Sequence, residues 1–325
     1  MERGCPGALA LMDAGVSAPQ VSVVMAVRNG GPSLAATLES VLSQGDVPLE
    51  FVVVDDGSTD HTPELLAQHA ARDSRLHVIT TAPRGLTQAL ISGCEAAQGQ
   101  WIARQDAGDQ SMPGRLARQL ALVRADPSAV LCSSAARFVV PSRPGAGAEE
   151  SPLELFVSRI PELRLQSGLE GPSHHGSVMF SRAAYRQVGG YRAPFYFAQD
   201  IDLWSRLVEL GRHRVHPEVL YQADASPGSI SGQHRREQLN FHALIRRASA
   251  ARRRGLSETP WLAKAERLSA RCPDSRTEIR RKARGAYFIA ACLRGRHPQA
   301  CRAYLREALR LDPLHLRARL RLLFT

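Results

Sequence analysis

The sequence contains almost no lysine. Only Lys264 and Lys282 are lysines among its 42 cationic side chains, and both lie toward the C-terminus. The preceding part of the chain therefore offers no lysine for a Walker phosphate-binding loop, a Schiff base or a receiver-type phosphoacceptor site. A glycine-rich GxGxxG segment is also missing after the apolar stretch at residues 21–27, which argues against a dinucleotide-dependent dehydrogenase.

Cysteines and long apolar runs are also scarce. The six cysteines include no CxxC pair or zinc-ligand spacing, so we expect ordinary thiols in a protein of the reducing cytoplasm. No stretch approaches the ~20 apolar residues that a membrane-spanning helix needs. The apolar residues 8–12 are too few for the core of a signal peptide, and we expect residues 1–18 to form a flexible leader.

Positive charge is unevenly distributed. Residues 235–325 contain 23 Lys and Arg against 7 Asp and Glu, whereas residues 1–234 contain 19 against 24. This contrast predicts a catalytic domain over residues 19–234 and a basic, all-helical region over residues 235–325.

The basic tail has three open interpretations. It fits a peripheral contact with anionic lipid at the inner face of the membrane, a nucleic-acid surface, or simply a solvated arginine-rich face. Aromatic residues are few there, so we expect no nucleic acid. Residues 286–293 and 300–311 resemble one tetratricopeptide-like hairpin, which must pack on the catalytic domain or on a partner to bury its apolar face.

Strand and helix patterns alternate through the first half of the chain. Short runs rich in β-branched residues are followed by segments with apolar residues at helical spacing. This order predicts an α/β fold with a doubly wound, mostly parallel sheet. The expected strands are residues 21–27, 51–54, 76–79 and 100–103, and the expected helices cover residues 34–42, 86–98 and the segments after Pro63 and Pro113.

Acidic residues follow two of these strands. Asp55 and Asp56 end one, and Asp106 and Asp109 follow another. Ligands of open α/β sheets bind outside the carboxyl ends of strands, so we expect both pairs to face one crevice. Such a site suits a ribose, a divalent cation and a diphosphate. The alternative, that Asp55 or Asp56 caps the following turn, explains one carboxylate better than two.

Six segments, in order, match motifs of a known family. The third reads VVDDGSTD, the fourth lies where the family has RxDADDxxxPxR, and the sixth lies where it has EDxDLW. On these motifs the chain resembles the inverting glycosyltransferases of family 2, whose nucleotide-sugar fold is called GT-A. The segments are residues 21–29, 39–44, 53–60, 104–115, 175–180 with 188–191, and 199–204.

The resemblance implies roles on the donor side. Asp55 and Asp56 would contact the nucleobase and ribose, and Asp106 would face the ribose and a metal ion. Arg84 and Arg104 would approach the phosphates, although Arg84 also fits a simple turn before the next helix.

The metal motif departs from the family pattern. Gly108 stands where relatives have the second Asp of the DxD motif. We expect Asp106 and Asp109, with the diphosphate of the donor, to hold one Mg²⁺ or Mn²⁺. Otherwise arginine side chains would stabilise the charge of the leaving diphosphate.

The resemblance also implies a general base. Asp200 would take the proton of the acceptor hydroxyl as that oxygen attacks the anomeric carbon. Gln199 replaces the glutamate that usually precedes this base. The competing interpretation makes Asp200 the N-cap of a helix over residues 203–210.

The acceptor side is less defined. His175 and Asp202 are expected to contact the acceptor, although Asp202 also fits a structural role. His174 and His175 together fit a contact with the acceptor or with a phosphate, or a solvated loop.

These roles predict an enzyme that transfers a sugar from a nucleotide-sugar donor to a hydroxyl group of a glycan or glycolipid, with inversion, in bacterial cell-surface glycan synthesis. No QxxRW segment follows, which predicts a non-processive enzyme. The alternative is a non-catalytic nucleotide-sugar-binding relative whose helical tail is a protein or membrane interaction module.

Overall fold

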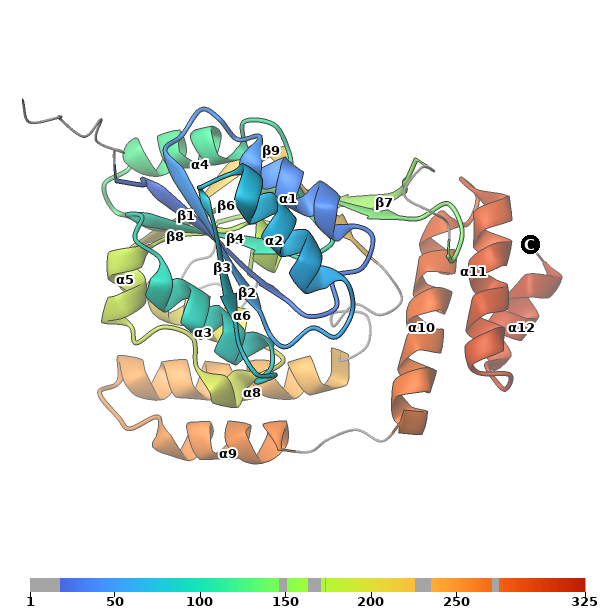
Figure 1. The fold of residues 1–325 in the computed structure, drawn as a ribbon. Coiled ribbons are helices and arrows are strands. Elements are labelled where there is room, and N and C mark those ends of the chain that lie inside the picture. Colours follow the sequence, from blue (N-terminus) through green and yellow to red (C-terminus); the bar gives the residue numbers. More distant parts are fainter. Residues whose placement is uncertain are drawn as a thin grey trace, which may run out of the picture.

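The computed structural model describes residues 18–145, 151–162, 171–172, 174–225, 235–270 and 275–324 (Figure 1). The expected leader lies outside these ranges except for residue 18.

Strands and helices alternate up to residue 124, as predicted, apart from a two-residue strand at residues 110–111, and helices follow from residue 235. The first part contains β1 (Val21–Val27), α1 (Leu34–Leu42), β2 (Leu49–Asp55), α2 (Thr62–Arg72), β3 (Leu76–Thr80), α3 (Leu86–Ala96), β4 (Trp101–Asp106), β5 (Gln110–Ser111) and α4 (Arg115–Arg124). The second part contains β6 (Ala129–Val140), β7 (Leu153–Ser158), η1 (His175–Ser177), β8 (Met179–Ser181), α5 (Arg182–Gln187), η2 (Ala193–Phe195), α6 (Gln199–Leu207) and β9 (Arg212–Asp224). The last part contains α8 (Arg235–Arg253), α9 (Thr259–Ser269), α10 (Ser275–Leu293), α11 (Pro298–Leu311) and α12 (Leu316–Leu323).

The first half of the sheet is built from buried apolar strands. All seven residues of β2 are buried, because helices cover both faces of this parallel region. One face packs against Leu34, Leu38 and Val41 of α1, which recur at helical spacing. The sequence therefore predicted these elements correctly.

The sheet as a whole is mixed. Its strand order is β3-β2-β1-β4-β8-β6-β9-β5, with β7 paired to β6. The pairs β3–β2, β2–β1, β1–β4 and β6–β9 are parallel, whereas β8, β5 and β7 pair antiparallel with their neighbours. The α/β prediction is confirmed, but the sheet is less parallel than expected. The reason is that strand–helix alternation ends after α4, and β7 returns from β6 without a crossover helix.

The C-terminal helices contact the sheet region in two places. Helices α8 and α9 pack through Phe241, Ile245 and Ala265 against Phe195 of η2. Arg252 of α8 adds an ion pair to Glu209, at 2.6 Å.

The α10–α11 hairpin packs elsewhere, beside β6 and β7 (Figure 1). Ala286 and Ile289 of α10 share a hydrophobic cluster with Val140 and Leu155. The hairpin thus buries its apolar face on the rest of the chain, one of the two outcomes expected. A domain boundary at residue 234 remains a prediction.

No helix in the described ranges is both long enough and apolar enough to cross a membrane.

Candidate functional site

The carboxylates at the end of β2 organise two loops. Asp55 and Asp56 are 1% and 4% exposed. Asp55 Oδ1 accepts a hydrogen bond from the backbone N–H of Ser58 at 2.9 Å. The two oxygens of Asp56 accept from the backbone N–H groups of Arg84, at 2.7 Å, and Gly85, at 2.8 Å. Both acids therefore have the turn-forming role that was the alternative interpretation, and a contact with the donor stays a prediction.

Arg84 enters this arrangement through its backbone. Its side chain is exposed just before α3, where a phosphate contact remains a prediction.

At the end of β4, a buried arginine holds Asp106. The guanidinium of Arg104 is fully buried, forms an ion pair with Asp106, and donates to the backbone carbonyls of Val24, at 2.6 Å, and Gln105, at 2.8 Å. Arg104 therefore lies behind Asp106, and the expected contact of Arg104 with donor phosphates is not supported. Arg28, directly after β1, does line the cavity at this edge.

Asp109 lies in the same cluster, with backbone and tyrosine partners. Its Oδ2 accepts from the hydroxyl of Tyr221 at 2.9 Å, and its Oδ1 accepts from the backbone N–H of Asp224 at 2.8 Å. Burial, followed by the neighbouring charge of Asp106, raises the pKa of Asp109 well above its usual value. Burial would also raise the pKa of Asp106, but Arg104 and two histidines outweigh it and lower that pKa to about 2. Asp106 is thus the more acidic member of the pair.

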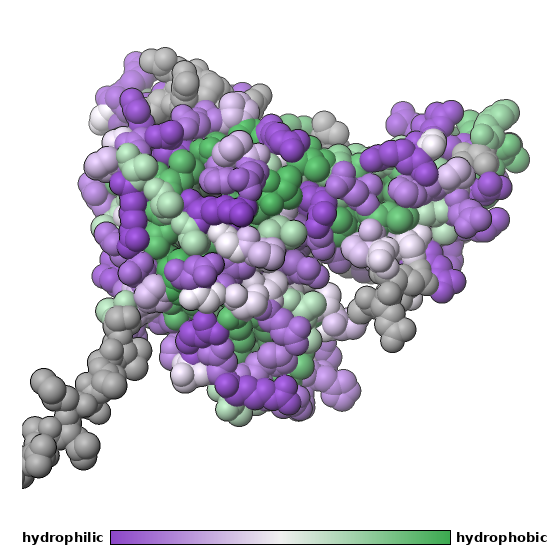
Figure 2. Space-filling model, turned by 90° about the horizontal axis from the view of Figure 1, so that it is seen from above, coloured by the Kyte–Doolittle hydropathy of each residue, from purple (hydrophilic) through white to green (hydrophobic). Residues whose placement is uncertain are grey.

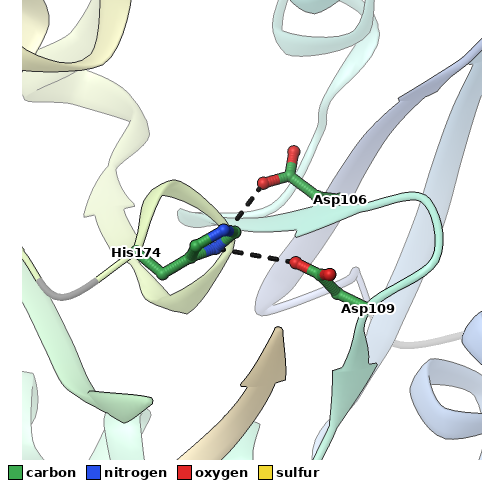
Figure 3. Close-up of side chains that lie close together, drawn as sticks. All are labelled: Asp106, Asp109 and His174. Carbon is green, nitrogen blue, oxygen red and sulfur yellow. Dashed lines mark ion pairs between the residues drawn. The ribbon is translucent and has the colours of Figure 1, made fainter. Parts of the chain in front are cut away.

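His174 completes the cluster (Figure 3). Its Nδ1 lies 3.7 Å from Asp106 Oδ2 and 3.6 Å from Asp109 Oδ2. Nδ1 also accepts the backbone N–H of Gly176 at 3.1 Å, and burial lowers the pKa of His174, so the ring is neutral. One ligand atom from each of the three side chains lies within 4.8 Å of the others.

These residues fit a divalent cation. Two carboxylates and a neutral imidazole are ligand types for such ions, and a cation would offset the burial and the charge repulsion that raise the pKa of Asp109. A cation bound by Nδ1 of His174 would replace the hydrogen bond that this nitrogen accepts from Gly176. The sequence named Asp106 and Asp109 for this role and left His174 as an acceptor or loop residue.

Gly108 explains why Asp109 faces Asp106. Gly108 has a φ of +95°, a conformation that other residues rarely adopt, and its N–H donates to Thr37 Oγ1 at 3.1 Å. The turn at Gly108 allows the next residue, Asp109, to point back into the cluster. An aspartate at position 108 would be strained in this turn.

Arg115 was not recognised as a site residue from the sequence, although it ends the matched segment 104–115. It is fully buried and donates to the backbone carbonyls of Arg104, at 2.8 Å, and Gly176, at 2.7 Å. Burial lowers its pKa to about 10. Arg115 therefore ties β4 to the segment that carries His174.

Asp200 lies in the first turn of α6. Its Oδ1 accepts the backbone N–H of Ile201 at 2.8 Å, and burial raises its pKa to about 6. The helix begins at Gln199 with Ala198 at the N-cap position. The N-cap interpretation of Asp200 is therefore wrong, because the helix starts earlier than the apolar pattern indicated.

Asp202 belongs to the scaffold. It is fully buried, and its oxygens accept from Arg192 Nε at 2.9 Å and Arg206 Nη2 at 2.6 Å. The expected acceptor contact of Asp202 is not supported, because both arginines hold this carboxylate inside the protein.

His175 faces the other side of Arg104. Its Nε2 is 2.8 Å from the hydroxyl of Tyr191 and accepts from Arg104 Nε at 3.3 Å. Burial and the charge of Arg104 lower the pKa of His175 to about 3, so the ring is neutral. Its contact with an acceptor stays a prediction.

One cavity of about 1030 Å³ joins these groups. Asp106, Asp109, His174 and Asp200 line it from the sheet region. The C-terminal helices also line it, with Gln238 and His242 from α8, and Gly285, Phe288 and Ile289 from α10. The tail, which the sequence suggested was a separate unit, thus forms a wall of the candidate site.

Comparison of the sequence with known proteins gives a family match. Residues 22–189 match the model of glycosyl transferase family 2. EpsE of Bacillus subtilis, named as a glycosyltransferase, is 30% identical over 254 residues, which cover 76% of this chain and 88% of EpsE. The succinoglycan biosynthesis protein ExoO of Rhizobium meliloti is 32% identical over 66% of this chain and 63% of its own length.

Solved structures share the fold. The mannosyltransferase PcManGT from Pyrobaculum calidifontis, in complex with GDP-Man and Mn²⁺, superposes with a TM-score of 0.54 at 19% identity, covering 94% of this chain and 83% of that one. TarS of S. aureus, residues 1–349 in complex with UDP, gives 0.53 at 16% identity, covering 92% and 91%.

Proposed function

Because the chain belongs to glycosyl transferase family 2, we propose that it transfers a sugar from a nucleotide-sugar donor to a hydroxyl group of a glycan or glycolipid acceptor, with inversion at the anomeric carbon. The observation that carries this proposal is the position of Asp200, which lines one cavity together with Asp106 and Asp109.

Asp200 is the proposed general base. With a pKa of about 6 it is mostly ionised at neutral pH, yet it is a stronger base than an exposed aspartate. It takes the proton of the acceptor hydroxyl while that oxygen forms a bond to the anomeric carbon. The bond from this carbon to the diphosphate breaks on the opposite face, and this single displacement inverts the configuration.

Asp106, Asp109 and His174 would hold a Mg²⁺ or Mn²⁺ ion. When bound, such an ion supplies positive charge for the leaving diphosphate. Arg104 keeps Asp106 ionised and in place, and Arg115 fixes the segment of His174. The support from relatives is that PcManGT was solved with Mn²⁺ and GDP-Man.

The donor is proposed to lie over the ends of β1 and β2. Asp55 and Asp56 shape the loops that would surround its nucleoside, and Arg28 and Arg84 are the cations proposed to contact its phosphates. A nucleotide-linked donor is supported by PcManGT and TarS, which were solved with GDP-Man and UDP.

The proposed setting is bacterial polysaccharide synthesis, supported by ExoO, a succinoglycan biosynthesis protein. The enzyme would add single sugars non-processively at the cytoplasmic side of the membrane. Exposed arginines of the C-terminal helices would provide the peripheral contact.

A panel of nucleotide-sugars, each with Mn²⁺, tests the proposal by thermal shift. A true donor stabilises the fold by RT ln(1 + [L]/Kd), and the same donor should then support transfer to an added acceptor. Binding of a nucleotide-sugar that is neither transferred to an acceptor nor hydrolysed would instead favour the non-catalytic alternative. No binding of any nucleotide-sugar would contradict both.

A further inference from the structure

The helix that carries Asp200 is short. Helix α6 has nine residues, and isolated helices of fewer than ~12 residues are marginal in water. The carboxylate of Asp200 accepts a hydrogen bond from the backbone N–H of Ile201, in the same helix, at 2.8 Å. The position of Asp200 at the cavity therefore follows the position of α6, which depends on what α6 packs against.

The helices of the tail are placed in two different ways. Figure 2 shows α10–α12 as an arm that projects from the sheet region. By contrast, α8 and α9 lie along that region, beside the segment that contains η2 and α6 (Figure 1). Helix α8 contacts α6, and α9 contacts η2. These two helices are therefore in position to hold α6.

The first contact of α8 lies at the start of α6. Ala198, the N-cap residue of α6, is buried and shares a hydrophobic cluster with Phe241 and Ile245 of α8. The side chain of Ile201 packs against the same cluster. The residue whose N–H binds Asp200 is thus itself held by α8.

The second contact of α8 lies just after the end of α6. Both carboxylate oxygens of Glu209 accept from Arg252, at 2.6 Å from Nε and 2.8 Å from Nη2. Ser249, one turn earlier on α8, donates from Oγ to Glu209 Oε1 at 3.1 Å. A bidentate pair between arginine and a carboxylate fixes direction as well as distance, so α8 also holds this end of α6.

The two contacts are in register. Ala198 and Glu209 lie the same number of residues apart as Phe241 and Arg252, about three helical turns. Helix α8 therefore runs beside α6 in the same direction and holds it at both ends.

Resting on the proposed function, we propose that Phe241 and Arg252 are positioning residues for the base Asp200. Both lie outside the cavity lining, so they act on the reaction through α6. A base must lie within hydrogen-bond reach of the hydroxyl that it deprotonates, and a misplacement of ~1 Å can cost about a hundredfold in rate. The tail thereby takes part in proton transfer without touching donor or acceptor.

The first test separates kcat from donor binding. Arg252→Gln should lower kcat by about tenfold, because α6 loses its hold at Glu209 and Asp200 is misaligned. The donor Kd from isothermal titration calorimetry and the Mn²⁺ requirement should not change. Arg254→Gln, at an exposed position just after α8, removes the same charge and should leave kcat unchanged. A wild-type kcat in Arg252→Gln, or an equal loss in Arg254→Gln, would overturn the proposal.

A double variant shows whether Arg252 acts through the base. A residue that acts only through Asp200 has no further effect once that carboxylate is gone. Arg252→Gln should therefore leave the residual kcat of Asp200→Asn unchanged, and Phe241→Leu should behave in the same way. A further tenfold loss in either double variant would mean a general structural role and overturn the positioning role.

Hydrogen exchange tests the hold of α8 on α6 without any transfer. Phe241→Leu and Arg252→Gln should speed exchange of the backbone amides of α6 and leave those of α4 unchanged. If the wild type transfers no sugar while α6 loses protection in both variants, the proposed function fails and the hold of α8 on α6 stands. If transfer occurs and neither α6 exchange nor kcat changes in the variants, only the positioning role fails.

Discussion

Two pairs of carboxylates end the two strands that flank β1, and they have opposite surroundings. The register of β1 aligns Val27 with Asp55 and Ala26 with Asp106, so the pairs lie at one level of the sheet. Backbone N–H groups satisfy Asp55 and Asp56. Asp106 and Asp109 instead lie beside a buried arginine, a tyrosine and a histidine, although Asp109 also accepts the backbone N–H of Asp224.

The difference shows that identical residues at equivalent strand ends can serve different purposes. Carboxylates bound by backbone N–H groups fix loops, because those donors cannot move independently of the chain. Carboxylates that repel each other are held in place by the scaffold and remain suited to a cation. The β2 pair therefore organises the loops of the proposed donor site, and the β4 pair is the proposed metal site.

The largest expected effect concerns Asp200, which belongs to neither pair. Asp200→Asn should reduce kcat by roughly a hundredfold or more, because an amide cannot take the proton. Steady-state kinetics would measure this, with little change in donor Kd. Asp202→Asn is the matched control on the same helix, and should mainly lower the Tm, because it weakens the contacts to Arg192 and Arg206. Normal turnover in Asp200→Asn would remove the base assignment.

The second-largest expected effect is a change in the Mn²⁺ requirement, which should differ between the two pairs of carboxylates. Asp109→Asn should raise the Mn²⁺ concentration for half-maximal rate by about tenfold or more, since even loss of an outer partner of a metal ligand has effects of this size. Asp56→Asn should raise the donor Kd and leave the Mn²⁺ requirement unchanged. Titration of activity with Mn²⁺ after chelation tests both variants. Full activity in excess chelator would refute the metal role.

The pH dependence should also reflect Asp200. Its raised pKa means that it is protonated, and inactive as a base, below about pH 6. At saturating Mn²⁺, kcat/KM should be near half its plateau at pH 6 and fall about tenfold for each lower pH unit. The residual kcat/KM of Asp200→Asn should not show this fall at low pH. A fall in kcat/KM centred near pH 4 instead would mean that the raised pKa of Asp200 does not control the reaction.

The smallest expected effect is on stability, where the pairs should differ again. Asp56→Asn places an amide N–H₂ against a backbone N–H donor and should destabilise the protein by about 1–2 kcal/mol. Asp109→Asn can still accept from Asp224 N and donate to Tyr221, and it removes repulsion from Asp106. In the presence of chelator, Asp109→Asn should therefore leave the free energy of unfolding unchanged or raise it. Urea unfolding measures both, and a large loss for Asp109→Asn would contradict the contrast.

Local patterns in the sequence determined strands β1 to β4, the helices up to residue 124 and the acid pairs at the strand ends. The GT-A type fold and the family expected from the motifs are confirmed. These features follow from neighbouring residues, since side-chain periodicity and turn residues act over a few positions. The same locality explains why the start of α6 and the mixed second half of the sheet were missed.

Only the tertiary structure decided which of these side chains meet. His174 reaches Asp106 and Asp109 because Arg115 ties distant segments together, and no local pattern encodes such a contact. Packing also turned Asp202 and Arg104 inward and brought α10 to the cavity. Burial, which no single stretch of sequence specifies, set the pKa values on which the proposed chemistry depends.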